Sequence, residues 1–175
     1  ELHRQELAFW DEVGNAREAA TARTLVAVSC AQRGAVEEAE RLFRLAGQLH
    51  SELGDKRSEG TLRYNLGILQ ALGGRIEEAS RDLRSARRLA QRQGSSVLEA
   101  HSAVAQVQLC ILENEVEAAV EHADAACKLT RRLDQPLVML QAKIGLTFAC
   151  LADRSLDSAE RAGWEALELA LKGEA

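Results

Sequence analysis

The sequence has little that would break a helix or build a strand. Its 175 residues contain one proline, Pro136, and aromatic side chains make up only 3% of the chain. With so few prolines the helix interiors stay unbroken, and the shortage of aromatic residues argues against strands. Alanine, leucine, glutamate and arginine, which favour helices, are abundant. The composition therefore predicts an all-α fold, and 46% hydrophobic residues suffice for a substantial core.

Long apolar runs and a secretion signal are also missing. No run approaches the roughly 18 apolar residues that a membrane-spanning helix requires. Residues 1–10, ELHRQELAFW, lack the basic start and the apolar centre of a signal peptide. We therefore expect no membrane partner and a cytoplasmic location. Because the sequence does not begin with methionine, we also expect it to be a fragment of a longer chain, with room for a targeting signal upstream.

Positive and negative residues are interspersed along the sequence and do not form long blocks of one sign. The net charge is −5, from 22 lysines and arginines and 27 aspartates and glutamates that alternate at helical spacings. Pairs such as Glu40 and Arg44, four residues apart, are typical of solvated helix faces. This mixture disfavours nucleic acid as a partner.

The residue patterns of metal sites and enzymes are absent. The four cysteines show neither C-x-x-C spacing nor a nearby histidine pair, which favours reduced structural thiols. No glycine-rich phosphate loop occurs, because Gly73 and Gly74 only end a predicted helix. We therefore expect no catalytic residues, no metal, no cofactor and no enzymatic activity. The cysteines are Cys30, Cys110, Cys127 and Cys150.

What the sequence does contain is a repeat. The stretch GRIEEASRDL at 74–83 restates GAVEEAERLF at 34–43, and an offset of forty residues continues through the chain without a gap. One column holds Ala39, Ala79, Ala119 and Ala159, and a second holds Ala46, Ala86, Ala126 and Ala166. The two columns lie seven residues apart, on one face of a helix, where small side chains let helices approach closely. A period this regular indicates a protein of stacked repeats.

Each repeat contains two positions that would end a helix. Glycine and asparagine tolerate the left-handed conformation found there, so each repeat should form two antiparallel helices. One set of breakers is Gly34, Gly74, Asn114 and Arg154, and the other is Gly14, Gly54, Gly94 and Asp134. Helix starts agree, since Asn15 with Glu18 and Ser96 with Glu99 have the spacing of capping boxes, and Pro136 suits a helix entrance.

These signals predict one repeat domain over residues 1–175. It would hold a half repeat at 1–14 and repeats at 15–54, 55–94, 95–134 and 135–175. The first helices are predicted at about 17–33, 57–73, 96–113 and 137–153. The second helices are predicted at about 36–53, 76–93, 116–133 and 156–172, with 1–13 as a lone second helix.

The repeat resembles that of the tetratricopeptide (TPR) family. The family signature has Leu-Gly in the first helix, then alanine, an aromatic residue and alanine in the second. Those positions are Leu66, Gly67, Ala79, Leu83 and Ala86 in one repeat, and Val26, Ala27, Ala39, Phe43 and Ala46 in the one before. The forty-residue unit, longer than the usual length of about 34, is similar to kinesin light chains and to bacterial signalling and transcription-regulating proteins. HEAT-type repeats share this length and stay as the alternative.

The resemblance implies a right-handed superhelical solenoid of antiparallel helix pairs, whose first helices line a concave groove for peptides or partner proteins. Some family members hold the carboxyl-terminal tails of chaperones with lysine, arginine and asparagine. Only Asn65 matches that set, because Thr24, Val28, His101 and Ala105 replace the others. We therefore expect no binding of chaperone tails.

Helical spacing within the first helices selects the side chains that would face such a groove. They are Thr21, Thr24, Leu25 and Val28; Thr61, Tyr64, Asn65 and Ile68; His101, Val104, Ala105 and Gln108; and Gln141, Ile144, Gly145 and Phe148. The ten predicted partner-binding residues are Thr24, Val28, Thr61, Tyr64, Asn65, Ile68, His101, Gln108, Gln141 and Ile144. For Ile68, Val104, Ile144 and Phe148, packing against the neighbouring repeat is the alternative.

Two further surfaces stand out in the second helices. Trp164, Leu167 and Leu171 form an apolar stripe where an earlier repeat has Arg84, Arg87 and Gln91, so we expect a patch for oligomer or interdomain contact, with a lone exposed tryptophan as the alternative. An arginine stripe lies at 81–92. An anion could dock on it, but the favoured interpretation is a solvated face paired with Glu77, Glu78 and Asp82.

The function predicted from these features is a non-catalytic scaffold for protein–protein interaction, which binds a peptide or partner protein in the first-helix groove. Two alternatives are a regulatory or sensor segment of a multidomain signalling or transcription-regulating protein, and a self-assembly module.

Overall fold

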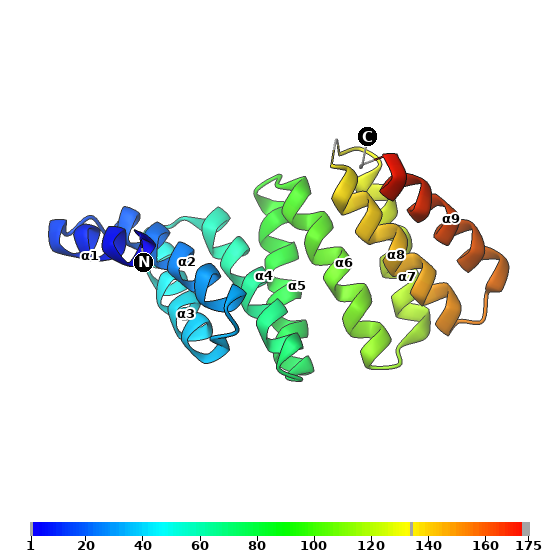
Figure 1. Cartoon of the computed structure of the whole chain (residues 1–175), viewed down its shortest axis with the longest axis horizontal. Helices are drawn as coiled ribbons and strands as arrows, with labels where there is room; N and C mark the ends of the chain where they lie inside the picture. The colour runs from blue at the N-terminus through cyan, green and yellow to red at the C-terminus, as the bar shows by residue number, and fades with distance from the viewer. Residues whose placement is uncertain (1, 134, 173–175) are drawn as a thin grey trace. The chain divides into compact units, whose positions relative to one another are not determined.

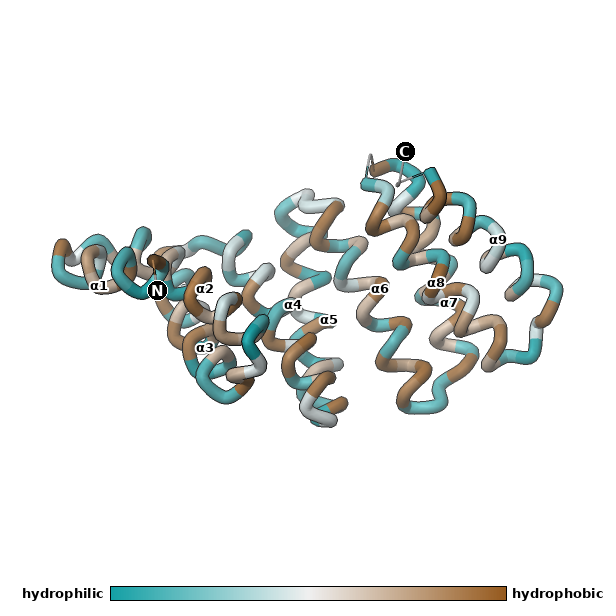
Figure 2. Tube along the Cα trace, in the orientation of Figure 1, coloured by the Kyte–Doolittle hydropathy of each residue, from teal (hydrophilic) through white to brown (hydrophobic). Residues whose placement is uncertain are grey.

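The computed structural model describes residues 2–133 and 135–172, and helices joined by short turns are the regular secondary structure within them (Figure 1). Hydrophobic and hydrophilic stretches alternate along the helices, as expected of amphipathic segments (Figure 2). The helices are α1 (Leu2–Val13), α2 (Ala16–Gln32), α3 (Val36–Glu52), α4 (Lys56–Leu72), α5 (Ile76–Arg92), α6 (Ser96–Leu112), α7 (Val116–Thr130), α8 (Pro136–Ala152) and α9 (Leu156–Lys172). The all-α prediction is confirmed.

The chain divides into two compact units. Unit 1, Glu1–Gln93, contains α1 to α5, and unit 2, Gly94–Ala175, contains α6 to α9. Within unit 1 the helices pair as α2 with α3 and α4 with α5, and α4 also packs on α3. Unit 2 repeats this arrangement, with α6 against α7, α8 against α9, and α8 packing on both α6 and α7.

The predicted helix-ending residues adopt the left-handed conformation in the described turns. The glycine φ angles run from 64° to 78°, and Asn114 and Arg154 each have a φ of 59°. Arg154 is an unusual choice here, because a side chain with a Cβ is strained in this region. The residues concerned are Gly14, Gly34, Gly54, Gly74, Gly94, Asn114 and Arg154. Asp134, the remaining predicted breaker, lies outside the described residues.

Two predicted helix ends differ from the structure, namely the cap at the start of α6 and the end of α7. Asn15 caps α2, with its side chain accepting a bond from the Glu18 N–H at 3.3 Å, but the capping box predicted at Ser96 and Glu99 is wrong. Ser95 precedes the helix instead and forms no side-chain cap, because Ser96 is already helical. Helix α7 ends at Thr130, earlier than predicted, where i to i+3 turns close onto the carbonyls of Leu129 and Thr130.

The core of unit 1 is built around Phe43, which is 1% exposed. Its ring lies among aliphatic side chains from three helices, and alanines of the repeat columns allow those helices to come close. The cluster comprises Val26, Ala27 and Cys30 of α2, Ala39, Leu42, Phe43 and Ala46 of α3, and Leu62, Leu66 and Leu69 of α4.

Helices α4 and α5 approach each other closely at Gly67. A Cβ added there would lie 2.7 Å from Cγ of Leu83 and 3.2 Å from the carbonyl oxygen of Ala79. The crossing of α4 and α5 therefore requires glycine for its space and not for its backbone conformation. This is the physical reason for the Leu-Gly pair that the sequence places at 66 and 67.

Unit 2 has two smaller core clusters. One joins Val107, Cys110, Ala119, Ala123 and Ala149, and the other joins Ala103, Val104, Ala126, Cys127 and Ala142. Small residues again dominate the helix contacts, and a Cβ on Gly145 would lie 3.4 Å from Val107. The buried side chain of Lys143 on α8 forms an ion pair with Glu165 of α9.

The four cysteines are all buried, and no disulfide joins them. Burial raises the pKa of the Cys127 and Cys150 thiols, which keeps these side chains protonated and unreactive near neutral pH. The prediction of core thiols is confirmed.

The interpretation of Glu40 as part of a solvated face is wrong. Glu40 is 7% exposed, and besides Arg44 it binds Arg75, whose Nη1 and Nη2 donate to its two oxygens at 3.2 and 2.7 Å. This bidentate pair ties the residue before α5 to the second turn of α3. It is a structural link between consecutive helix pairs.

Candidate functional site

In unit 1 the predicted binding face lies along α2 and α4. Thr61 is exposed, while Thr24 and Val28 are half-buried, and Val28 also packs against the core. The Thr24 hydroxyl donates to the Ala20 carbonyl at 2.9 Å, and the Thr61 hydroxyl donates to the Arg57 carbonyl at 3.4 Å. Since each hydroxyl proton is used inside its own helix, these threonines present methyl groups and acceptors to a ligand.

The remaining unit 1 candidates sit close together on α4. Tyr64, Asn65 and Ile68 are each half-buried, so part of every side chain stays accessible. Burial raises the pKa of the Tyr64 phenol, which therefore remains a neutral hydroxyl at physiological pH. A phenol and an amide on one turn and an aliphatic group on the next offer both hydrogen bonding and apolar contact.

In unit 2 the predicted residues lie on the adjacent helices α6 and α8. Gln108, Gln141 and Ile144 are exposed, whereas His101 is half-buried. Burial lowers the pKa of His101, so its imidazole is neutral at physiological pH. This face therefore carries polar but uncharged groups beside exposed apolar ones.

Three residues of the expected lining belong to the interior instead. Val104 and Ala105 are 5% and 4% exposed, and Gly145 is buried against Val107. For Val104 this is the alternative of packing against the neighbouring repeat: helix α8 packs on α6, so the face that α6 alone would present to solvent is partly covered. Ile144 and Phe148, for which packing was the alternative, remain 41% and 57% exposed.

The structure also reveals a longer apolar face than the sequence predicted. Leu137 and Leu151, 74% and 48% exposed, extend the row of Ile144 and Phe148 along α8. We call these four residues the α8 stripe. The spacing of one helix face therefore runs along α8 from Leu137 to Leu151, and helical periodicity in the sequence is the signal that indicates it.

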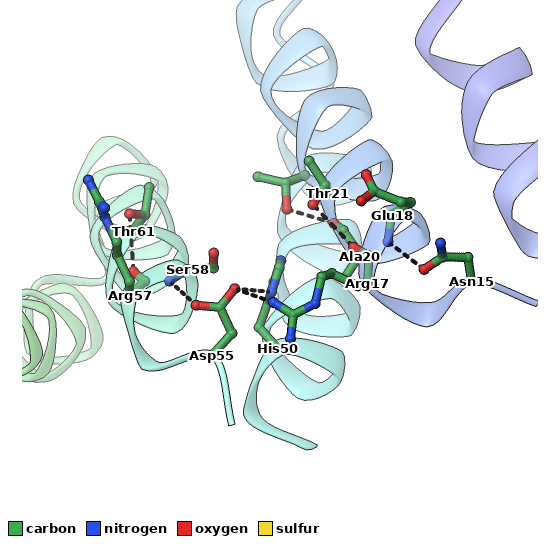
Figure 3. Close-up of polar contacts among 11 residues, drawn as sticks. Asn15, Arg17, Glu18, Ala20, Thr21, His50, Asp55, Arg57, Ser58 and Thr61 are labelled. Atoms are coloured by element: carbon green, nitrogen blue, oxygen red, sulfur yellow. Dashed lines mark hydrogen bonds and ion pairs between the residues drawn. The ribbon is translucent and has the colours of Figure 1, made fainter. Parts of the chain in front are cut away.

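A polar network fixes the turn that leads into α4 (Figure 3). Asp55 caps the helix by accepting the Ser58 N–H at 3.1 Å, and its other oxygen lies 3.2 Å from Nδ1 of the buried His50. Arg17 of α2 approaches the same oxygen at 3.9 Å. Desolvation raises the pKa of Asp55, but the Ser58 hydrogen bonds and the charges of His50 and Arg17 together lower it below its usual value. The network positions α4, which bears Tyr64 and Asn65.

Replacing Asp55 with alanine should lower the unfolding free energy by about 1 kcal/mol at neutral pH, because the helix cap is lost. Since folding lowers the pKa of Asp55, its charge stabilises the protein above the unfolded pKa of about 3.9, and this contribution disappears as the pH falls through the lower folded value. Urea titrations at pH 7 and pH 3 would measure the difference. Asp55→Asn, which keeps a capping oxygen, should lose less; equal losses in both variants would contradict the capping role.

The predicted patch on α9 is exposed in unit 2. Trp164, Leu167 and Leu171 are 64%, 47% and 62% exposed, and the Trp164 indole N–H lies 3.4 Å from a carboxylate oxygen of Glu160. A mainly apolar hollow of about 530 Å³ lies between α8 and α9. Leu151, Leu156 and Gly163 line it together with Trp164 and Leu167.

No group of metal-binding side chains occurs among the described residues, and none of the helices described there is long and apolar enough to cross a membrane.

Comparison with solved structures bears on the fold. BtubC (BKLC) from P. vanneervenii superposes with a TM-score of 0.88 at 18% identity, over 99% of this chain and 72% of that one. The nearly identical TPR-like repeats of a Podosopora anserina protein assigned as a kinesin light chain give a TM-score of 0.73 at 15% identity, over 98% and 85% of the two chains. The chain has a TPR-like helical-repeat fold. No family model matches the chain, and the search of curated proteins finds no match.

At these identities the likeness establishes the fold alone, so a partner has to be argued from the side chains of this chain.

Proposed function

We propose that the chain is a non-catalytic, cytoplasmic scaffold whose first helices recognise a peptide or a partner protein. The repeats would act together as one interaction domain of the forty-residue variety, with the right-handed superhelix implied by the resemblance. The rigid helix pairs hold the binding side chains in place before a ligand arrives, which reduces the ordering cost of binding.

The observation that carries this proposal is the accessibility of the first-helix faces. In unit 2, Ile144 and Phe148 stay exposed on α8 next to the exposed amide of Gln141. In unit 1, Tyr64 and Asn65 offer an uncharged hydroxyl and an amide on neighbouring positions of α4. Apolar anchors for affinity beside polar groups for orientation are what a helix or an extended peptide requires. Thr24, Val28, Thr61, Ile68, His101 and Gln108 complete the proposed surface.

The double variant Tyr64→Ala/Asn65→Ala should lose a partner that the unaltered chain captures from cell extract. The physical reason is that truncating a central aromatic and its neighbouring amide removes both contact area and orientation, typically 2 kcal/mol or more at an interaction hot spot, or about thirtyfold in affinity. Quantitative mass spectrometry of the captured proteins measures the effect, after circular dichroism shows equal helicity.

A matched control removes similar groups from a second helix. Leu45 and Gln48 of α3 are both exposed, so Leu45→Ala/Gln48→Ala should retain the partner. Equal retention by the two double variants would refute recognition through the first helix of unit 1.

A second proposed surface is the Trp164 patch. Exposed tryptophan and leucine beside an apolar hollow favour contact with another copy or with another part of a multidomain signalling or regulatory protein. Light scattering would decide for self-assembly if a dimer is found and Trp164→Glu dissociates it, and against self-assembly if the chain is monomeric at all concentrations.

A further inference from the structure

A polar hollow of about 570 Å³ lies within unit 1 among helices α3, α4 and α5. Two acidic residues, Glu78 and Asp82, lie in its wall. None of the proposed first-helix binding residues of unit 1 lines it. Its five arginines are Arg44, Arg63, Arg81, Arg84 and Arg88. We call this feature the arginine hollow.

Asp82, one of the acids expected to neutralise the stripe on α5, pairs with another helix. Asp82 accepts from Nη1 of Arg63 and from Nε2 of Gln70, both at 3.0 Å, so it pairs with α4. Arg81 donates to the backbone carbonyl of Glu77 and not to its carboxylate. The favoured interpretation of an internally paired, solvated stripe is therefore wrong for Asp82.

This arrangement leaves positive charge without a counter-ion in the wall of the hollow. Among the residues that the structure describes, neither Arg84 nor Arg88 has a carboxylate within ion-pair distance. The two lie four residues apart on one helix face, and like charges at that spacing repel each other. An anionic ligand would relieve this repulsion.

The charge of α5 is also opposite to that of its equivalents. Helix α5 carries five arginines and three acidic residues, a net charge of +2. The second helices α3, α7 and α9 each carry a net charge of −2, from two basic and four acidic residues in α3 and α9, and from one lysine and three acidic residues in α7. Within a chain of net charge −5, the basic character is therefore specific to this one repeat.

We propose that the arginine hollow binds an acidic helical segment of a partner protein. Arg81, Arg84 and Arg88 follow the three- and four-residue spacing of one helix face and span about 10 Å at 1.5 Å per residue. A second helix with glutamates at the same spacing presents carboxylates at matching intervals. Guanidinium groups bind carboxylates with two parallel hydrogen bonds, which gives both affinity and register.

The composition of the hollow favours a peptide over a nucleic acid. Its wall contains no aromatic side chain on which a base could stack, and the carboxylate of Glu78 would repel a continuous phosphate backbone. A helical peptide presents its carboxylates at separate positions, so it can bind the arginines without placing a carboxylate against Glu78. This binding site is separate from the proposed first-helix surface, and either could exist without the other.

The test uses the whole chain and a defined probe. The probe is a fluorescent peptide of about 20 residues, built of alanine with glutamates at i, i+3 and i+7 on one face, because isolated helices shorter than about 12–15 residues are marginal in water. Its affinity is measured by fluorescence anisotropy for the unaltered chain, for Arg84→Gln/Arg88→Gln, and for Arg41→Gln/Arg57→Gln. The last pair removes the same charge from exposed arginines of α3 and α4 that do not line the hollow.

We expect Arg84→Gln/Arg88→Gln to weaken binding at least about tenfold, because hydrogen bonds to charged groups are lost. Arg41→Gln/Arg57→Gln and Tyr64→Ala/Asn65→Ala should each change it less than about twofold, the latter showing that the result does not depend on the first-helix surface. Absence of binding to the unaltered chain, or equal weakening by both arginine pairs, would overturn the proposal. Tighter binding of a single-stranded oligonucleotide of equal charge would also overturn it, in favour of nucleic acid.

Discussion

Replacing Phe43 with alanine is expected to lower the unfolding free energy of unit 1 by about 3–5 kcal/mol. The ring is 1% exposed and packs against Val26, Leu62 and Leu66, which come from the two helices flanking α3. Truncation would leave a cavity among side chains that are held by separate helices and cannot easily close it. Urea unfolding followed by circular dichroism measures the change.

Phe148 provides the matched control for this substitution. It is 57% exposed on α8, so Phe148→Ala should change stability by less than about 0.5 kcal/mol. Similar losses for the two variants would mean that Phe43 is not the centre of the core described for unit 1. A loss below about 1 kcal/mol for Phe43→Ala would lead to the same conclusion.

Gly67→Ala is expected to destabilise unit 1 by about 1–3 kcal/mol, although alanine is the better helix former. The added methyl carbon would lie 2.7 Å from Cγ of Leu83 and 3.2 Å from the backbone oxygen of Ala79. Leu83 is fully buried and the oxygen belongs to the main chain, so helices α4 and α5 would have to separate. Thermal unfolding of the variant measures the cost.

Gly47 is a glycine in a helix interior without this constraint. A Cβ there would meet only Cδ1 of Leu62, at 4.0 Å, so Gly47→Ala should be neutral or stabilising by up to about 1 kcal/mol. Opposite signs for the two glycine variants would support the close crossing at Gly67. Stabilisation by both would contradict it.

The fold was predictable from the sequence because residues that tolerate the left-handed conformation mark the turns between the helices. Glycine or asparagine stands at six of the seven described left-handed positions, and the alanine columns at positions such as Ala39 and Ala46 coincide with fully buried helix contacts. Such features depend on local conformation and side-chain size, which a single sequence shows directly.

The partners of charged residues were not predictable in this way. Spacing along one helix assigned Glu40 to Arg44 and Asp82 to the α5 arginines, yet Glu40 also binds Arg75 and Asp82 turns toward Arg63. Ion pairs between helices depend on distances that only the packed structure sets. The same limit explains Ala105, whose predicted outward face is covered inside unit 2.

The exposed α9 patch, by contrast, could be predicted from the sequence, because apolar residues replace the charged residues of an earlier repeat there. Trp164 and Leu167 replace arginines found at the equivalent positions of α5, and both are exposed in the structure. A change of character within a repeat column is a stronger signal than hydrophobicity alone, because the other copies show what the position normally requires.

The most direct test of the proposed function is site-specific photo-cross-linking to a captured partner. A benzophenone amino acid is placed at Thr61 or Gln141, which are exposed on first helices, and in parallel at Glu37 or Lys128, which are exposed on second helices. We predict cross-links to the partner from Thr61 and Gln141 and none from Glu37 and Lys128. Cross-links confined to the second-helix positions would contradict recognition through the first helices.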